Sequence, residues 1–126
     1  MKLKTLFMIN AVIAIVYGIC FVLIPSQVLL VYGLTAGAGE VLMGQYFGVA
    51  LIGIGLITWL IKNVTEPNAT GAVILALLIS DVIGFIISVI GTISGVMNTF
   101  GWSAVIIYLF LAIGFAYFQF KKPTKS

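Results

Sequence analysis

The strongest constraint on this chain is the length of its apolar segments. The first covers residues 5–24; it is broken only by Asn10 and is followed by Pro25 and Ser26. An α-helix rises by 1.5 Å per residue, so about 20 residues cross a hydrocarbon core of about 30 Å. Residues 5–24 are therefore predicted to form a transmembrane helix.

Three further apolar segments predict transmembrane helices over residues 40–61, 69–92 and 102–120. Residues 62–68 have the composition of a solvated turn, and a turn containing Gly and Asn, around residues 95–101, precedes the last helix. Residues 26–39 are apolar but too short to cross, so we expect a short interfacial segment there. The predicted fold class is an all-α, four-helix transmembrane bundle, one domain over residues 1–126.

The composition supports the membrane class. Apolar residues make up 63% of the chain and charged residues 7%, against roughly 45–50% and 25% in ordinary soluble domains. A soluble globule would have to expose large apolar patches, whereas helices in lipid need apolar surface and have no use for charge.

The same composition narrows the range of functions. The chain has no histidine and one cysteine, Cys20, which excludes histidine-based metal sites, histidine-containing catalytic triads and an intrachain disulfide. Its six lysines occur singly or in short runs without arginine, unlike the clustered basic face of a nucleic-acid-binding protein. We therefore expect no catalytic residues, no metal, no cofactor and no nucleic-acid partner.

Lysine placement predicts the orientation in the membrane, because short loops rich in lysine stay on the cytoplasmic side. If the N-terminus is cytoplasmic, all six lysines fall on that side, namely Lys2, Lys4, Lys62, Lys121, Lys122 and Lys125. We predict a multi-pass protein of the cell membrane with both termini cytoplasmic.

Small residues are predicted to mediate helix packing, because lipid-embedded helices associate by close contact rather than by hydrophobic exclusion from water. The second apolar segment carries Gly44 and Gly48, and the third carries Ser80, Gly84 and Ser88 within a row of small residues at every fourth position. We expect these residues to pack the chain against itself. A homo-oligomer interface is the alternative.

Asp81 is the residue that most needs an explanation, since it lies near the centre of the third apolar segment. An ionised carboxylate there costs about 2.5–3.5 kcal/mol even on the lenient insertion scale. Asp81 must therefore stay protonated, reach water or find donors, and it should face the other helices. Its predicted partners, judged by depth in the membrane, are Asn10, Tyr17, Gln45, Tyr46 and Tyr108.

Three interpretations of Asp81 remain open. The first is a structural hydrogen bond between helices. The second is a proton- or cation-binding site of a small transporter or channel. The third is the polar floor of a pocket for a lipid-like ligand, with Tyr17, Gln45 and Tyr108 beside it. An enzyme is the least supported class, because acid–base catalysis needs a second positioned group.

Glycine and aromatic placement carries a resemblance to known families. Pro25 is followed by the connector 32–34, by Gly44-Gln45-Tyr46-Phe47-Gly48 and by the segment 53–60. This order resembles small uncharacterised prokaryotic four-helix integral membrane proteins and, more distantly, the DoxX-like proteins. The resemblance implies the four-helix fold and offers no settled catalytic residues to carry over.

The sequence as a whole predicts a non-enzymatic protein that binds or scaffolds within the lipid bilayer, with either a membrane protein or a lipid-like ligand as its partner. The alternative is a small proton- or cation-linked transporter or channel that uses the membrane-embedded Asp81. A channel would need a continuous polar stripe, and few polar residues are available to form one.

Overall fold

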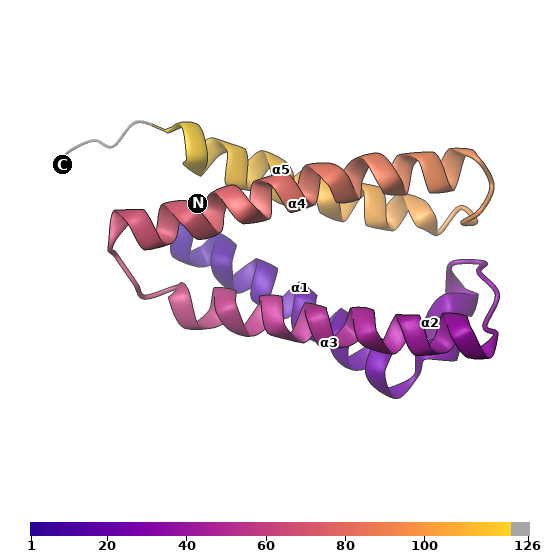
Figure 1. The fold of residues 1–126 in the computed structure, drawn as a ribbon. Helices are drawn as coiled ribbons and strands as arrows, with labels where there is room; N and C mark the ends of the chain where they lie inside the picture. The colour runs from indigo at the N-terminus through magenta and orange to yellow at the C-terminus, as the bar shows by residue number, and fades with distance from the viewer. Residues whose placement is uncertain (122–126) are drawn as a thin grey trace.

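The computed structural model describes residues 1–121, and within them the chain is all α-helical. Its helices are α1 (Leu3–Leu23), α2 (Pro25–Val31), α3 (Ala38–Ile61), α4 (Pro67–Ile93) and α5 (Gly101–Phe120) (Figure 1). Helices α1, α3, α4 and α5 are each long and apolar enough to cross a membrane. The prediction of four long apolar helices is thus confirmed, and they indicate a multi-pass membrane protein. Lys122 and Lys125 lie outside the described residues.

The short helix α2 occupies the first part of the expected interfacial segment. It begins at Pro25, where a missing N–H costs nothing because the first helical position has no partner for it. It ends in a Schellman motif: Gly33 has a φ of +77°, and the N–H of Leu34 donates to the carbonyl of Leu29. A left-handed residue at this point stops the helix and turns the chain toward α3.

The two other acidic residues have local roles at helix starts. The Glu66 carboxylate accepts a hydrogen bond of 2.7 Å from the N–H of Ala69 and so caps α4. The Glu40 carboxylate accepts one of 2.9 Å from the N–H of Gly37 and another from the Thr35 hydroxyl before the first turn of α3. Caps of this kind satisfy N–H groups that a helix leaves free, and the negative charge suits the helix dipole. Asp81 has no such role.

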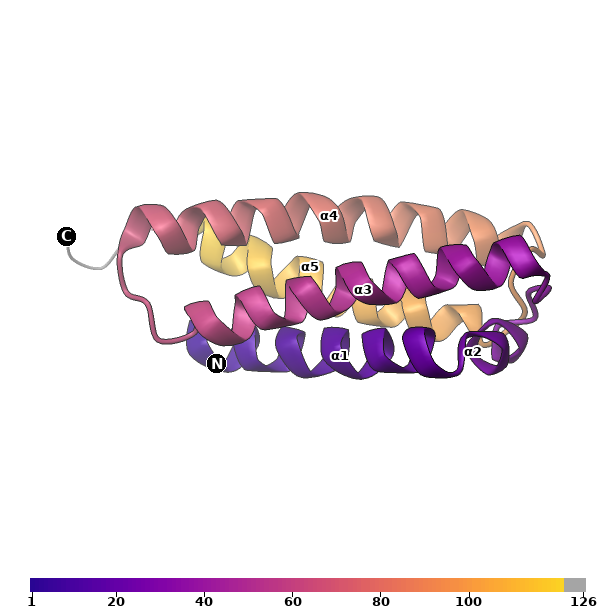
Figure 2. The ribbon, with the colours of Figure 1, turned by 60° about the horizontal axis from the view of Figure 1, so that its bottom comes forward.

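The four long helices form two antiparallel pairs, α1 with α3 and α4 with α5 (Figures 1 and 2). The first pair packs closely at Gly18 and Gly48: a Cβ atom built on Gly48 would lie 2.6 Å from the carbonyl oxygen of Gly18. Only glycine allows the two backbones to approach so closely. In the second pair, the ring of Tyr108 fills the space beside Gly84.

The two pairs meet at both ends of the molecule. At the end where α1 begins and α5 ends, an apolar core joins α1, α4 and α5, with the rings of Phe7 and Phe115 6.0 Å apart. At the other end, the N–H of Asn98, in the turn between α4 and α5, donates to the carbonyl of Tyr32, and the ring of Tyr32 packs against that of Phe100 at 5.0 Å. Helices α3 and α4 make no extended contact along their length. The pairs are thus held together at their ends and separated between them.

The described lysines lie at one end of the molecule. Lys2 and Lys4 are at the start of α1, Lys62 directly follows α3 and Lys121 directly follows α5, so all four lie at the end where α1 begins and α5 ends (Figure 1). The turn between α4 and α5 and the connector around α2 lie at the opposite end and carry no lysine.

Candidate functional site

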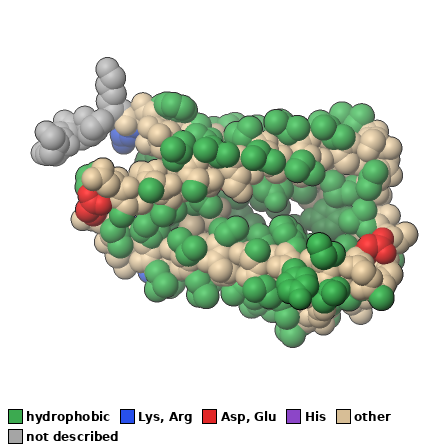
Figure 3. Space-filling model, in the orientation of Figure 1, with side chains coloured by type: hydrophobic (Ala, Val, Ile, Leu, Met, Phe, Trp, Pro, Cys, Tyr) green, Lys and Arg blue, Asp and Glu red, His purple; other side chains and the backbone are tan. Residues whose placement is uncertain are grey.

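A cavity of about 350 Å³ lies between the two helix pairs. The space-filling view shows a hollow between the α1/α3 pair and the α4/α5 pair (Figure 3). This volume falls within the range of about 300–1,000 Å³ that is typical of small-molecule sites. Most lining side chains are apolar, and the polar ones are Asn10, Tyr17, Tyr32, Ser80, Asp81, Ser88 and Tyr108.

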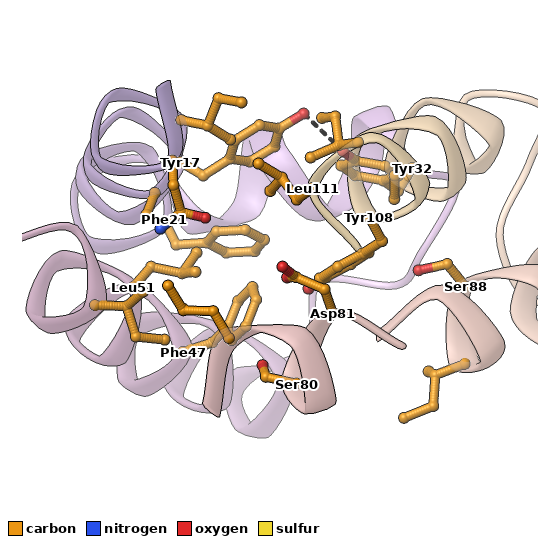
Figure 4. Close-up of a pocket in the computed structure, with 18 of the residues that line it drawn as sticks. Tyr17, Phe21, Tyr32, Phe47, Leu51, Ser80, Asp81, Ser88, Tyr108 and Leu111 are labelled. Carbon is orange, nitrogen blue, oxygen red and sulfur yellow. Dashed lines mark hydrogen bonds between the residues drawn. The ribbon is translucent and has the colours of Figure 1, made fainter. Parts of the chain in front are cut away.

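Among the described residues that line this cavity, Asp81 supplies the only acidic group. The residue is 5% exposed, and among residues 1–121 its Oδ2 atom has no hydrogen-bond partner. Its carboxyl group points from α4 toward the middle of the cavity, beside Tyr108 and opposite Phe21 and Leu51 (Figure 4). A buried polar atom without a partner costs roughly 1–3 kcal/mol, and more when it is charged. The fold therefore retains an unfavourable group in the wall of the cavity.

Tyr108 is held next to Asp81 by the glycine one turn further along α4. A Cβ atom built on Gly84 would overlap the Tyr108 ring, with three ring atoms closer than 3 Å. Asp81 and Gly84 are three residues apart and so lie on the same face of α4. The absence of a side chain at Gly84 thus lets Tyr108 lie across α4 and bound the space in front of the carboxylate.

Two tyrosines close the cavity near the end opposite the lysines. The hydroxyls of Tyr17, from α1, and Tyr32, from the end of α2, are 3.2 Å apart and form a hydrogen bond (Figure 4). The backbone of Tyr32 is fixed in turn by Asn98, whose side-chain amide also donates to the carbonyl of Val31. This wall therefore depends on contacts between segments that are far apart in sequence.

None of the predicted partners of Asp81 donates a hydrogen bond to its Oδ2 atom. Asn10 lines the cavity, but its side-chain amide is 3.4 Å from the hydroxyl of Thr58, which is fully buried. Gln45 is not among the lining residues; its amide donates to the carbonyl of Val22 at 3.2 Å and ties α3 to α1. Tyr46 is 63% exposed. The structure thus brings Asn10, Tyr17, Tyr108 and Asp81 to one cavity without a hydrogen bond to Asp81 Oδ2.

The predicted packing residues fall into two groups. Gly44 and Gly48 face α1, with Phe21 beside both, and Gly84 faces Tyr108 of α5. Ser80 and Ser88 line the cavity instead, Ser88 buried and Ser80 exposed. The row of small residues on α4 therefore serves helix contact at Gly84 and cavity lining on either side of it.

Two residues of this region went unrecognised in the sequence. Thr58 lies one turn from Gly55 on α3, the face that packs on α1, and this spacing could have indicated it as a partner for Asn10. Tyr32 lies in the connector, and only contacts with distant segments bring it to the cavity, so nothing local in the sequence marked it.

The acidic and metal-ligating side chains of this region are few. Within residues 1–121 there is no group of three or more His, Cys, Asp or Glu side chains that could hold a metal ion. A lone carboxyl group among apolar and aromatic side chains offers one strong hydrogen-bonding or charged contact, and such sites fix the polar end of a mostly apolar molecule.

The fold and the cavity together define a class, a multi-pass helical membrane protein with an internal polar group. No protein-family model, curated protein or solved structure matches this chain. The resemblance to the DoxX-like proteins therefore stays a prediction.

Proposed function

We propose that this chain binds a small lipid-like molecule inside the bilayer, with the apolar part of the ligand in the cavity between the helix pairs and its polar end at Asp81. The observation that carries the proposal is the unpartnered Oδ2 atom of Asp81 in the wall of a cavity of about 350 Å³. A purely structural aspartate would be expected to make the interhelical hydrogen bond that compensates for its burial.

The position of the cavity supports a ligand that arrives from the lipid. Helices α3 and α4 make no extended contact, so an opening between these two candidate membrane-spanning helices leads to the cavity. A molecule dissolved in the bilayer would reach Asp81 through this opening without crossing a polar surface. The mostly apolar lining suits such a molecule.

The alternative is proton- or cation-linked transport through Asp81. The apolar core at one end of the molecule argues against a channel. The apolar core around Phe7 and Phe115 fills the space between α1, α4 and α5 at the lysine end. A conducting path would need polar groups or water there. Binding needs only the cavity, so we favour it over transport.

We further propose that the protein resides in the cell membrane with the lysine-bearing end at the cytoplasmic face. The four described lysines share that end, and the opposite connectors contain none (Figure 1). The cavity polar groups Tyr17 and Tyr32 would then lie in the outer half of the membrane.

A cavity-filling substitution tests the binding proposal. Ala104 lines the cavity, whereas Ala76 is exposed on α4 and does not, so Ala104→Phe and Ala76→Phe make a matched pair. Purified parent and variants in nanodiscs would be titrated with 2-naphthalenemethanol, a neutral apolar alcohol, by its fluorescence. We expect Ala104→Phe to weaken binding at least tenfold and Ala76→Phe to leave it within about twofold of the parent.

Two results would contradict the proposal. One is the absence of saturable binding to the parent. The other is equal binding by the parent and by a folded Ala104→Phe variant, because the probe would then bind outside the cavity.

A further inference from the structure

The aromatic side chains around Asp81 narrow the chemistry of the ligand. Five aromatic rings line the cavity, from α1, α3, α5 and the end of α2: Tyr17, Phe21, Tyr32, Phe47 and Tyr108. The rings of Phe21 and Phe47 pack edge to face with their centroids 5.1 Å apart, and lie across the cavity from Tyr108 (Figure 4). The Asp81 carboxyl group points into the space between them.

No basic side chain of residues 1–121 lines this cavity. The described lysines lie at the end of the molecule where α1 begins. Two of them approach aromatic rings at that end: the Lys62 ammonium lies 4.2 Å from the centroid of the Trp59 ring, and the Lys121 ammonium lies 5.4 Å from the centroid of the Tyr117 ring. The protein therefore does not supply the positive charge that a buried carboxylate would need as its counter-ion.

From this geometry we infer that the preferred ligand is a lipophilic amine, bound as its ammonium cation with Asp81 as counter-ion and the aromatic rings around its apolar body. Aromatic faces attract cations through their negative electrostatic potential, and this attraction grows when both groups are removed from water. An ammonium group also donates hydrogen bonds, which the Asp81 carboxylate would accept. The inference rests on the proposed function and specifies the class of ligand.

A neutral or anionic ligand would interact less favourably with Asp81 than a cation would. An alcohol would give Asp81 one hydrogen bond but no counter-ion, so the carboxyl group would either stay protonated or bear the cost of an unpaired charge. An anionic ligand such as a fatty acid would place two negative charges together, which is strongly unfavourable at low dielectric. The ordering expected from charge is thus amine, then alcohol, then carboxylate.

Three probes of one shape test this ordering in the full chain. 2-Naphthylmethylamine, 2-naphthalenemethanol and 2-naphthoic acid share the same ring system and at pH 7 are cationic, neutral and anionic. We expect the parent in nanodiscs of zwitterionic lipid to bind the amine at least tenfold more tightly than the alcohol, and the acid more weakly than either. Empty nanodiscs would correct for partition into the lipid.

The Asp81→Asn variant then assigns the preference to the carboxylate. It keeps the size and hydrogen-bonding capacity of the side chain but removes its charge. We expect it to lose at least tenfold in amine affinity and to keep its alcohol affinity within about threefold. Phe47→Leu, which removes one ring, should weaken amine binding more than alcohol binding. Phe110→Leu, which removes a ring of α5 that does not line the cavity, should change neither by more than about twofold.

The outcomes separate the two proposals. Equal binding of amine and alcohol to the parent would overturn the inference and leave the proposed function intact. Binding of no probe would overturn both. An amine preference that persists in Asp81→Asn would also overturn the inference, because the charge of Asp81 would then play no part. The comparison of probes on the parent decides the question even if Asp81→Asn does not fold.

Discussion

The ring of Tyr108 occupies the space that a side chain at Gly84 would fill, and this relationship sets the shape of the cavity around Asp81. Three Tyr108 ring atoms would lie within 3 Å of a Cβ atom at position 84. The pair therefore links the packing of α4 on α5 to the position of the wall next to the carboxylate. A change at Gly84 should affect both stability and ligand binding.

We predict that Gly84→Ala destabilises the protein, by about 1–3 kcal/mol, because the added methyl group forces the Tyr108 ring to move within a packed contact. The melting temperature in detergent and the affinity for 2-naphthylmethylamine should both fall. Gly71→Ala is the matched control, since it lies on the same helix with no atom within 4 Å of an added Cβ. In a Tyr108→Ala background, Gly84→Ala should cost less, because the clash is gone. An unchanged melting temperature for Gly84→Ala alone would mean that this contact is not tight.

The contact between Gly18 and Gly48 should tolerate substitution even less. An added Cβ at Gly48 would meet the carbonyl oxygen of Gly18 at 2.6 Å, and a backbone atom yields less readily than the end of a side chain. Gly48→Ala should therefore lower the melting temperature by separating α1 from α3, with a cost of about 1–3 kcal/mol or more. Gly53→Ala, on the same helix in open space, should cause no loss. Equal melting curves for the two variants would contradict the α1/α3 pairing.

Asp81→Leu should separate stability from function. Because Oδ2 has no partner, replacing the carboxyl group with an apolar side chain removes a desolvation cost of roughly 1–3 kcal/mol without breaking a bond to that atom. The ligand-free variant should melt at the same temperature as the parent or higher, and it should lose amine binding. A residue kept at a cost to stability is typical of a functional site. A clear fall in melting temperature would instead support the structural interpretation of Asp81.

The helix positions could be predicted from sequence because the bilayer fixes their length. The predicted starts at residues 40 and 69 fall two residues after the observed starts at Ala38 and Pro67. Hydropathy alone misses these first turns because they contain polar or charged residues. At α4, the cap from Glu66 to the N–H of Ala69 brings Pro67 into the helix.

The pairing of the helices could not be predicted in the same way. Small residues occur on every long helix, and sequence spacing gives the face on which they lie without naming the partner. Gly48 selects α1 because Gly18 lies at the matching height, which is a property of two segments together. The separation into two helix pairs follows from such matches, so the sequence of one helix alone does not predict its partner.

The candidate site was likewise predictable only in part. The inward position of Asp81 was predicted, since a carboxylate facing lipid would be too costly, and it is 5% exposed. Its surroundings were harder to predict, because depth in the membrane says nothing about direction around a helix axis. Asn10 and Gln45 have suitable depth, yet each finds a partner within the α1/α3 pair.

The last prediction concerns orientation in the membrane, which lysine placement determines through the positive-inside rule. Two exposed positions report on the two ends: Thr65 lies in the loop between α3 and α4 next to Lys62, and Thr99 lies in the turn between α4 and α5. In a Cys20→Ser background, the variants Thr65→Cys and Thr99→Cys would be treated in intact cells with a membrane-impermeant maleimide. We expect labelling of Thr99→Cys alone.

Permeabilised cells provide the control, since both cysteines should then react. The reverse pattern in intact cells would place the lysines outside and contradict the orientation. Labelling of both cysteines in intact cells would mean that the two ends are not separated by the membrane, or that molecules insert in both directions. A single orientation matters for the proposed site, because the predicted one would place the wall formed by Tyr17 and Tyr32 in the outer half of the bilayer and would determine which leaflet supplies the proposed ligand.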